Sequence, residues 1–147
     1  MDDETRLRAV ADYQFGKPAG DVLFEGDLEV HRTSRGRVSQ VFADGDRLAT
    51  LKTTGRLTLG FEGGRRLHEA TEPPWMRVEV GDESLPYVRD GRNAFAKFVR
   101  RVDDGVRAGD EVLVTGPGDV YVKPGRAELS AVEMEDFDVG MAVYVRR

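Results

Sequence analysis

The fold of the second half of this chain is decided by the stretch Gly91-Arg92-Asn93-Ala94-Phe95-Ala96-Lys97. Before this stretch, Ser84 can cap a short helix with a proline in its first turn, and Gly91 can end that helix. After the glycine, apolar residues predict a strand over residues 95–99, which carries Lys97. The stretch therefore predicts a short helix, a glycine turn and the start of a sheet.

Further short strands are predicted on both sides of this stretch. The helix that the sequence predicts last begins with a capping box, Ser130-Ala131-Val132-Glu133, runs through Phe137 and ends at Gly140. Many short strands with tight turns and two short helices are typical of a small, partly open β-barrel. The strands are indicated by apolar residues at alternating positions: Met76, Val78 and Val80; Val112 and Val114; Val120 and Val122; Met141, Val143 and Val145.

The first half has a different pattern, which predicts a small α+β domain. Helical spacing of apolar residues predicts a helix over residues 3–15, and a second, short helix is expected over 63–70. Between them, strands are expected at 28–31, 38–42 and 47–52, followed by an alternating run at Leu57, Leu59 and Phe61, with a hairpin turn at Asp44-Gly45-Asp46. Because Pro73-Pro74 disfavours both helix and strand pairing, we place the domain boundary there, giving domains 1–74 and 75–147.

The composition excludes several classes of protein. The chain has 147 residues, a net charge of -5 and no cysteine, so disulfides, thiol chemistry and Cys-based zinc sites are excluded. His68-Glu69 lacks the second histidine of a zinc-hydrolase motif, and no phosphate-binding loop or nucleophile elbow is present. We therefore predict no catalytic residue, no metal and no cofactor. The absence of a long apolar run or a secretory signal predicts a cytoplasmic protein without a membrane span.

Arginine is the dominant cation, with 18 of the 22 positive charges. Arginine makes planar, bidentate contacts with phosphate, but the same excess can arise from coding bias or growth at high salt, with each cluster paired to nearby acids. The second-half clusters differ because Arg89, Arg92 and Asn93 surround Gly91, with Lys97 following and Arg146 on the last strand. A basic groove beside a close-approach glycine suits a phosphate backbone.

Residues 75–147 resemble a PUA domain, the RNA-binding module of pseudouridine synthases and archaeosine transglycosylases. The first half is similar to the small α+β domain that precedes PUA in archaeal tRNA-guanine transglycosylase. The resemblance implies an α+β domain followed by a mostly-β pseudo-barrel, without the family's catalytic barrel. It therefore implies tRNA binding but not the family's catalytic activity. It rests on Gly91–Lys97, Ala108–Val112, Gly125–Ser130, Met134–Val143, and, in the first half, Val10–Gly16, Gly36–Val41, Leu48–Leu51 and Arg65–His68.

The resemblance implies structured RNA as the partner, a tRNA above all, with a tRNA-modifying enzyme as a further possible partner. Gly91 would allow close backbone approach, Asn93 would bond a base edge or a 2′-hydroxyl, and the cations would neutralise phosphates. The sequence departs from the family at Val122-Lys123-Pro124, where relatives often have small residues. The expected RNA-binding residues are Arg89, Gly91, Arg92, Asn93, Lys97, Lys123, Gly125, Arg126 and Arg146.

Two alternatives remain open from the residues alone. The first is a protein–protein adaptor, or detached accessory subunit of a tRNA-modifying enzyme, that uses Tyr13, Phe15, Arg65 and Arg66 as its interface. The second is a small-ligand enzyme on a β-barrel, which would need a deep pocket lined by paired carboxylates.

Overall fold

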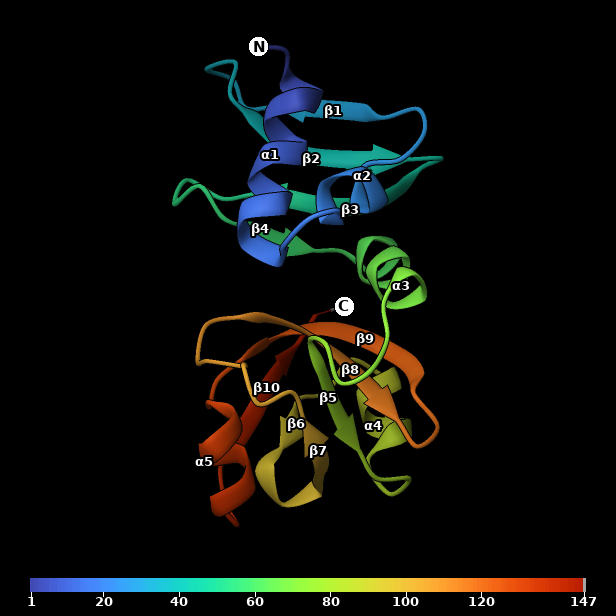
Figure 1. Cartoon of the computed structure of the whole chain (residues 1–147), viewed down its shortest axis with the longest axis vertical. Helices are drawn as coiled ribbons and strands as arrows, with labels where there is room; N and C mark the ends of the chain where they lie inside the picture. The colour runs from blue at the N-terminus through green and yellow to red at the C-terminus, as the bar shows by residue number, and fades with distance from the viewer. Residues whose placement is uncertain (147) are drawn as a thin grey trace. The chain divides into compact units, whose positions relative to one another are not determined.

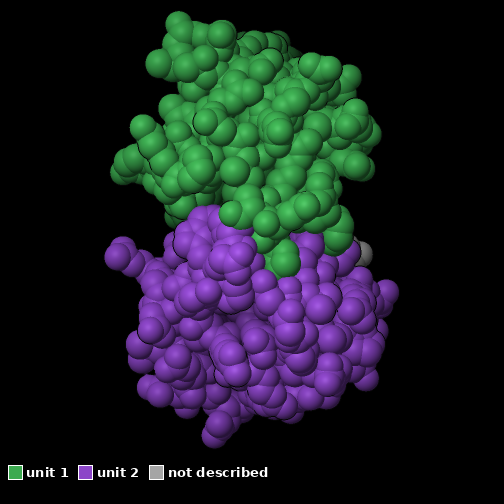
Figure 2. Space-filling model, turned by 45° about the vertical axis from the view of Figure 1, so that its right-hand side comes forward, with its two compact units in different colours: residues 1–70 green, residues 71–147 purple. Residues whose placement is uncertain are grey.

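The computed structural model describes residues 1–146 and divides the chain into two compact units, residues 1–70 and 71–147 (Figures 1 and 2). No helix within the described residues is both long and apolar enough to cross a bilayer.

Unit 1 is a four-stranded antiparallel meander with three helices, of which the first and third pack on the strands and the second packs on the other two helices (Figure 1). The strands follow the chain in the order β1-β2-β3-β4. Buried leucines from the helices and strands, including Leu7, Leu48 and Leu67, form the core together with Phe24, which follows the second helix. The elements are α1 (Asp3–Phe15), α2 (Ala19–Leu23), β1 (Glu29–Arg32), β2 (Val38–Ala43), β3 (Asp46–Leu51), β4 (Leu57–Leu59) and α3 (Phe61–Ala70).

The helices and strands of unit 1 lie close to where the sequence predicts them, with two exceptions. The Asp2 side chain caps α1 by accepting a hydrogen bond from the Thr5 amide at 2.7 Å. The α2 helix was not predicted, and Phe61 begins α3 instead of ending a strand. The two glycines of α3 weaken a helix in isolation, but a Cβ at Gly63 would overlap the carbonyl oxygen of Leu48. Close packing of α3 on β3 therefore requires glycine there.

Unit 2 is a six-stranded sheet with two short α-helices, and its strands lie in the order β6-β10-β9-β8-β5-β7. All neighbouring strands are antiparallel except β5 and β8, which are parallel. The elements are β5 (Arg77–Val80), α4 (Leu85–Arg89), β6 (Ala94–Phe95), the 3-10 helix η1 (Ala96–Phe98), β7 (Val99–Val102), β8 (Glu111–Gly116), β9 (Val120–Ala127), α5 (Ala131–Asp136) and β10 (Met141–Val145).

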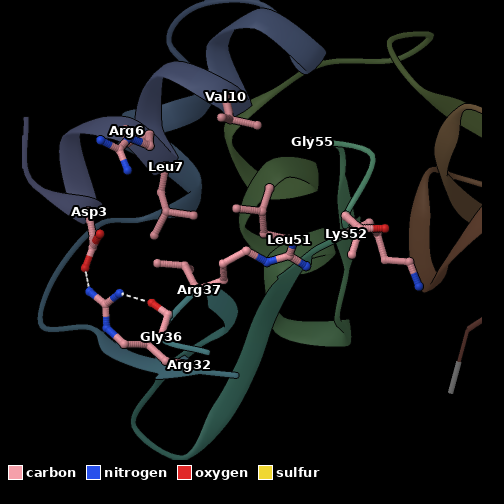
Figure 3. A pocket seen from close by; sticks show the side chains of 12 residues that line it. Asp3, Arg6, Leu7, Val10, Arg32, Gly36, Arg37, Leu51, Lys52 and Gly55 are labelled. Atoms are coloured by element: carbon pink, nitrogen blue, oxygen red, sulfur yellow. Dashed lines mark hydrogen bonds and ion pairs between the residues drawn. The ribbon is translucent and has the colours of Figure 1, made fainter. Parts of the chain in front are cut away.

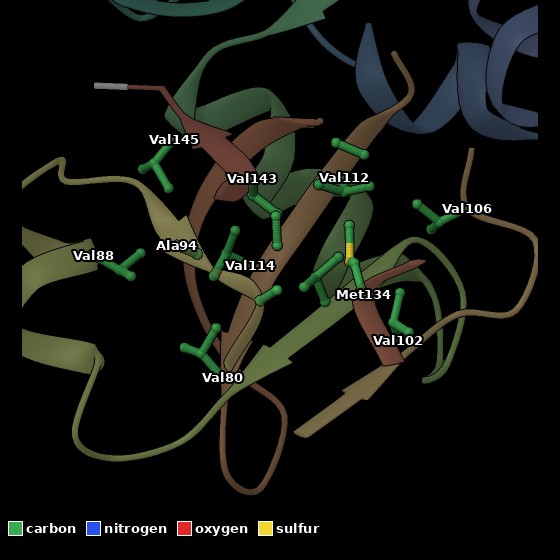
Figure 4. Close-up of a cluster of buried hydrophobic side chains, with 14 of the residues drawn as sticks. Val80, Val88, Ala94, Val102, Val106, Val112, Val114, Met134, Val143 and Val145 are labelled. Atoms are coloured by element: carbon green, nitrogen blue, oxygen red, sulfur yellow. The ribbon is translucent and has the colours of Figure 1, made fainter. Parts of the chain in front are cut away.

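The sheet of unit 2 must curl, because its two edge strands are consecutive in the chain. Only Ala96–Phe98 separate β6 from β7, and a link of three residues reaches about 10 Å. Six flat strands would place those edges about 24 Å apart. Curling the sheet brings the edges together and encloses a core of mainly valine, with Met134 from α5 (Figure 4). The α+β domain followed by a mostly-β pseudo-barrel is therefore confirmed.

The predicted strand over residues 95–99 is wrong. The chain leaves β6, which pairs with β10, and enters β7, which pairs with β5, so it crosses between sheet edges and cannot be one strand. Lys97 consequently lies in η1. The capping box of α5 is confirmed: the Glu133 amide donates to Ser130 Oγ at 3.3 Å and the Ser130 amide donates to Glu133 Oε1 at 2.9 Å. This helix ends at Asp136, one residue earlier than predicted.

Candidate nucleic-acid interface

The loop after α4 turns sharply at Gly91. Gly91 has a φ of 85°, in the left-handed region that glycine adopts without strain. Its amide donates to the Val88 carbonyl, and the Arg92 amide donates to the Tyr87 carbonyl, both at 2.9 Å. This closing turn presents Arg92 at the surface, with its guanidinium carbon 5.9 Å from the centroid of the exposed Tyr87 ring.

Asn93 ties this loop to the last strand. Its side-chain oxygen accepts a hydrogen bond from the Val145 amide at 2.9 Å. Val145 lies opposite Gly125 in the β9–β10 pairing, and Tyr144 lies opposite Arg126. The structure thus brings Asn93, Gly125 and Arg126 together, although the chain separates the first from the others by some thirty residues.

Gly125 is required by packing within the sheet. A Cβ at this position would overlap the Val143 side chain and would lie 2.9 Å from the Tyr144 carbonyl oxygen. Real side chains essentially never approach that closely, so β10 can lie against β9 only if residue 125 is glycine. The sequence predicts an RNA contact at Gly125. The structure shows that the packing of β10 against β9 is by itself a reason for glycine at this position.

Arg126 and Tyr144 form an exposed stack across β9 and β10. The Arg126 guanidinium lies 5.1 Å from the Tyr144 ring centroid, and its Nε donates to Glu128 at 3.1 Å. Hydrogen bonding to Glu128 raises the pKa of the Arg126 guanidinium, so it carries its charge at every physiological pH. Tyr144 is 44% exposed, which leaves ring surface available to a planar partner.

Arg146 is already bound inside unit 2. Its Nε and Nη2 donate to the two carboxylate oxygens of Glu111, at 2.9 and 2.7 Å, and its amide donates to the Pro124 carbonyl. The two side chains are only 16% and 4% exposed. This bidentate pair stabilises the end of β10, and it occupies the donors that the sequence reasoning assigned to phosphate.

The remaining predicted cations are differently placed. Arg89 and Arg92 are exposed near the end of α4, and neither forms an ion pair with any residue in 1–146. Lys123 lies half-buried on β9, the strand that α4 contacts. Lys97 is exposed on η1, with its ammonium 5.0 Å from the Phe98 ring centroid, and the structure ties it to none of the other predicted residues.

Sequence reasoning missed the buried arginine of β5. Arg77, which alternates with the apolar Met76, Val78 and Val80, is 4% exposed and donates to both carboxylate oxygens of Asp119 at 3.1 Å and to Thr71 Oγ1 at 2.6 Å. Its partner lies 42 residues away, so no local signal could have indicated the pair. Among residues 1–146, no three histidine or carboxylate side chains gather as metal ligands.

Comparison with known proteins shows what these two units are. Residues 76–147 match the family model of the PUA domain, and residues 5–74 match the patch-forming domain C2 of tRNA-guanine transglycosylase. The chain contains a PUA domain. Its PUA unit follows a C2 unit of the transglycosylase type, as the residues of both halves predicted.

Curated relatives contain both units together. The chain is 42% identical over 149 residues to the tRNA-guanine(15) transglycosylase of Methanothermobacter thermautotrophicus, and 46% identical over 142 residues to that of Pyrococcus abyssi. These matches cover 100% and 96% of the chain but only 23% and 24% of the relatives. The chain therefore spans about a quarter of the length of these relatives.

Solved structures share the arrangement of elements. A hypothetical protein from Pyrococcus horikoshii superposes with a TM-score of 0.74 over 99% of the chain and 90% of its own length, at 17% identity. A conserved PUA domain protein from Thermoplasma acidophilum superposes with a TM-score of 0.67 over 98% and 86%, at 19% identity. At these identities the likeness establishes the fold.

Proposed function

We propose that this chain is a non-catalytic RNA-binding protein that holds a structured RNA, a tRNA, in an archaeosine- or pseudouridine-type modification pathway in the cytoplasm. The observation that carries the proposal is the joining of the Gly91–Asn93 loop to β9 and β10 through Asn93 and Val145. This connection supports a common surface formed by the exposed arginine loop and the arginine–tyrosine stack.

Each part of this surface has a distinct role in the proposal. Arg89, Arg92 and Lys123 neutralise phosphates, and Lys97 extends the positive charge beyond them. The Gly91 turn lets the backbone approach the RNA, and the Asn93 amide group can still donate to a base edge or 2′-hydroxyl while its oxygen holds Val145. Arg126 stacked on Tyr144 offers a flat surface to a terminal or unpaired base.

Two residues support this surface from inside the PUA unit. Gly125 allows β10 to lie against β9, and Arg146 anchors the end of β10 on Glu111. Both position the binding groups in this proposal without contacting RNA. The C2 unit, with the boundary at residue 74, orients the PUA unit on the RNA. The relatives' printed activity, transglycosylation of tRNA, supports tRNA as the ligand.

The test is tRNA binding by the full chain at several salt concentrations, followed by fluorescence anisotropy. Neutralising each phosphate on a duplex contributes about 0.7–0.9 to the slope of log affinity against log salt. Arg92→Ala should lower the slope by about that amount, whereas Arg107→Ala, an exposed arginine in the β7–β8 connection, should leave it unchanged. Undetectable binding at low salt by folded protein would exclude the function.

The adaptor role is the second candidate, and the exposure of Tyr13 favours it. Tyr13 is 95% exposed on α1, so its aromatic ring is accessible to a protein partner. The arginines proposed for the same interface are occupied: Arg65 pairs with Glu62 and Glu69, and Arg66 donates to the Leu23 and Glu25 carbonyls. Recovery of a tRNA-modifying enzyme that survives nuclease treatment would favour the adaptor, and its loss on Tyr13→Ala would place the interface on α1.

A further inference from the structure

Charge is segregated along the strands of unit 1. In an antiparallel meander the first and third turns lie at the same end of the sheet, and the second turn lies at the other end (Figure 1). The first and third turns, residues 32–37 and 52–56, contain five cations and no acidic residue. The second turn, Asp44-Gly45-Asp46, is acidic. The two turns at one end of the sheet are therefore basic although the chain as a whole carries a charge of -5, and Asp3 of α1 lies at the same end, bound to Arg32.

A cavity of about 440 Å³ opens at this basic end, between α1 and the two cationic turns (Figure 3). Its floor is aliphatic and consists of the buried Leu7 and the half-buried Val10, Val38 and Leu51. Ligand-binding cavities in proteins commonly enclose about 300–1,000 Å³. This cavity is thus large enough for a small planar group, and solvent reaches its apolar floor.

The rim of the cavity carries charge that the protein does not neutralise. Asp3, the acidic residue of the lining, is bound to Arg32, which also donates to the Gly36 carbonyl at 2.8 Å (Figure 3). Arg6, Arg37 and Lys52 are exposed and form no ion pair with any other residue of the described chain, 1–146. Three of the residues that line the cavity therefore carry positive charges without an ion-pair partner among residues 1–146.

We propose that this cavity, formed by Leu7, Val10, Val38 and Leu51 beneath Arg6, Arg37 and Lys52, receives one unpaired nucleotide of a bound RNA. The juxtaposition of an aliphatic floor and a cationic rim fits a group that is apolar and planar at one end and anionic at the other. A nucleotide extruded from a stem has both parts: the base lies on the floor beside the Arg37 guanidinium, and the flanking phosphates lie on the rim. This inference rests on the proposed RNA-binding function.

Other classes of ligand match the floor and the rim of the cavity less completely than an unpaired nucleotide does. A free inorganic anion would be held by the rim but would leave the aliphatic floor in contact with water. An apolar ligand would cover the floor but would meet three uncompensated charges, which are costly to desolvate. Fully paired RNA presents phosphates to the rim and keeps its bases stacked out of reach.

The test compares two fluorescein-labelled RNA hairpins that differ only in one bulged nucleotide, each titrated with the full chain. We expect the bulged hairpin to bind about fivefold more tightly or better, which is the preference that one contacted base confers. Arg37→Ala and Lys52→Ala should bring the two affinities together. Arg35→Ala, in the same turn as Arg37 but outside the cavity lining, should preserve the preference. Both lining variants replace exposed side chains, so folding should be unaffected.

The outcomes separate this inference from the proposed function. Equal affinity of the wild-type chain for the two hairpins overturns the nucleotide cavity and leaves RNA binding in place. A preference for the bulge that survives both lining variants also overturns it, because the base must then bind elsewhere. Absence of binding to either hairpin and to tRNA overturns both. A 4-thiouridine at the bulge should crosslink to α1 or β3 if the inference is correct.

Discussion

Replacing Arg146 by methionine tests whether this residue is a structural anchor or an RNA contact. The guanidinium lies in a bidentate pair with Glu111, whose side chain is 4% exposed, and methionine would keep most of the apolar stem while removing every donor. Glu111 would then remain in the protein interior without its cationic partner. The variant should therefore destabilise the PUA unit strongly.

The magnitude follows from the burial of the pair. Removing one partner of a buried ion pair costs about 3–5 kcal/mol, because the other charge stays desolvated and unpaired. Arg146 retains some exposure, at 16%, so we expect the lower end of this range, about 3 kcal/mol. For a unit of this size each kcal/mol lowers Tm by about 4–8 °C, so Tm should fall by about 12–24 °C.

The assay is urea denaturation followed by the fluorescence of Trp75, the single tryptophan of the chain, which lies in unit 2. The double variant Glu111→Leu with Arg146→Met should recover most of the loss, because apolar residues of similar volume replace a buried pair at little cost. A loss below about 1 kcal/mol for Arg146→Met, accompanied by weaker tRNA binding, would refute the reasoning and return Arg146 to the RNA interface.

Four further substitutions each have their own expected outcome. Gly125→Ala should cost about 1–3 kcal/mol of unit 2 stability, because its Cβ would overlap Val143; a neutral result by Trp75 fluorescence would contradict the packing reason. Ser130→Ala should cost about 1 kcal/mol by removing the cap of α5, measured by urea denaturation. The hydrogen bonds from Ser130 hold the pKa of Glu133 below its ordinary range, so the stability that ionised Glu133 provides is present above about pH 4.3 and is lost as the pH falls through the folded-state pKa. Glu133→Gln should therefore lower the urea midpoint at pH 7 and leave it nearly unchanged at pH 3; an equal effect at both pH values would show that the charge is irrelevant. Arg92→Ala should leave stability within about 0.5 kcal/mol of wild type, since the side chain is exposed.

Local features of this fold could be predicted because the residues that determine them are close in the sequence. The Ser130 capping box needs four consecutive residues. The Asp44-Gly45 turn needs two residues that tolerate positive φ, and both have it, at 51° and 83°. The resemblance to PUA rests on several such short motifs in their order, which is why it covers most of residues 75–147.

Features that depend on distant residues could not be predicted. Residues 95–99 have a strand-like pattern, but the order of strands in the sheet forces a crossing from one edge to the other at Ala96–Phe98. Arg77 and Asp119 are separated by 42 residues, and Arg146 and Glu111 by 35, so nothing in the neighbouring sequence marks either arginine as buried. Sequence reasoning therefore treated Arg146 as one more exposed cation.

Several residues of the predicted site lie together in the structure, but the part that each one plays in the fold could not be predicted from the sequence. Gly91 and Arg92 lie in the expected turn, and Asn93, Gly125 and Arg126 come together. The stack of Arg126 on Tyr144 was not predicted, because Tyr144 meets Arg126 only through the β9–β10 register. The RNA contacts themselves remain a proposal.

The most direct test of the RNA-binding surface is ultraviolet crosslinking of the full chain to tRNA, with identification of the crosslinked residues by mass spectrometry. Our account predicts crosslinks in the Arg89–Asn93 segment and at Tyr144, and their loss at high salt. Crosslinks confined to other surfaces of the PUA unit, or the absence of crosslinks at low salt with folded protein, would contradict it.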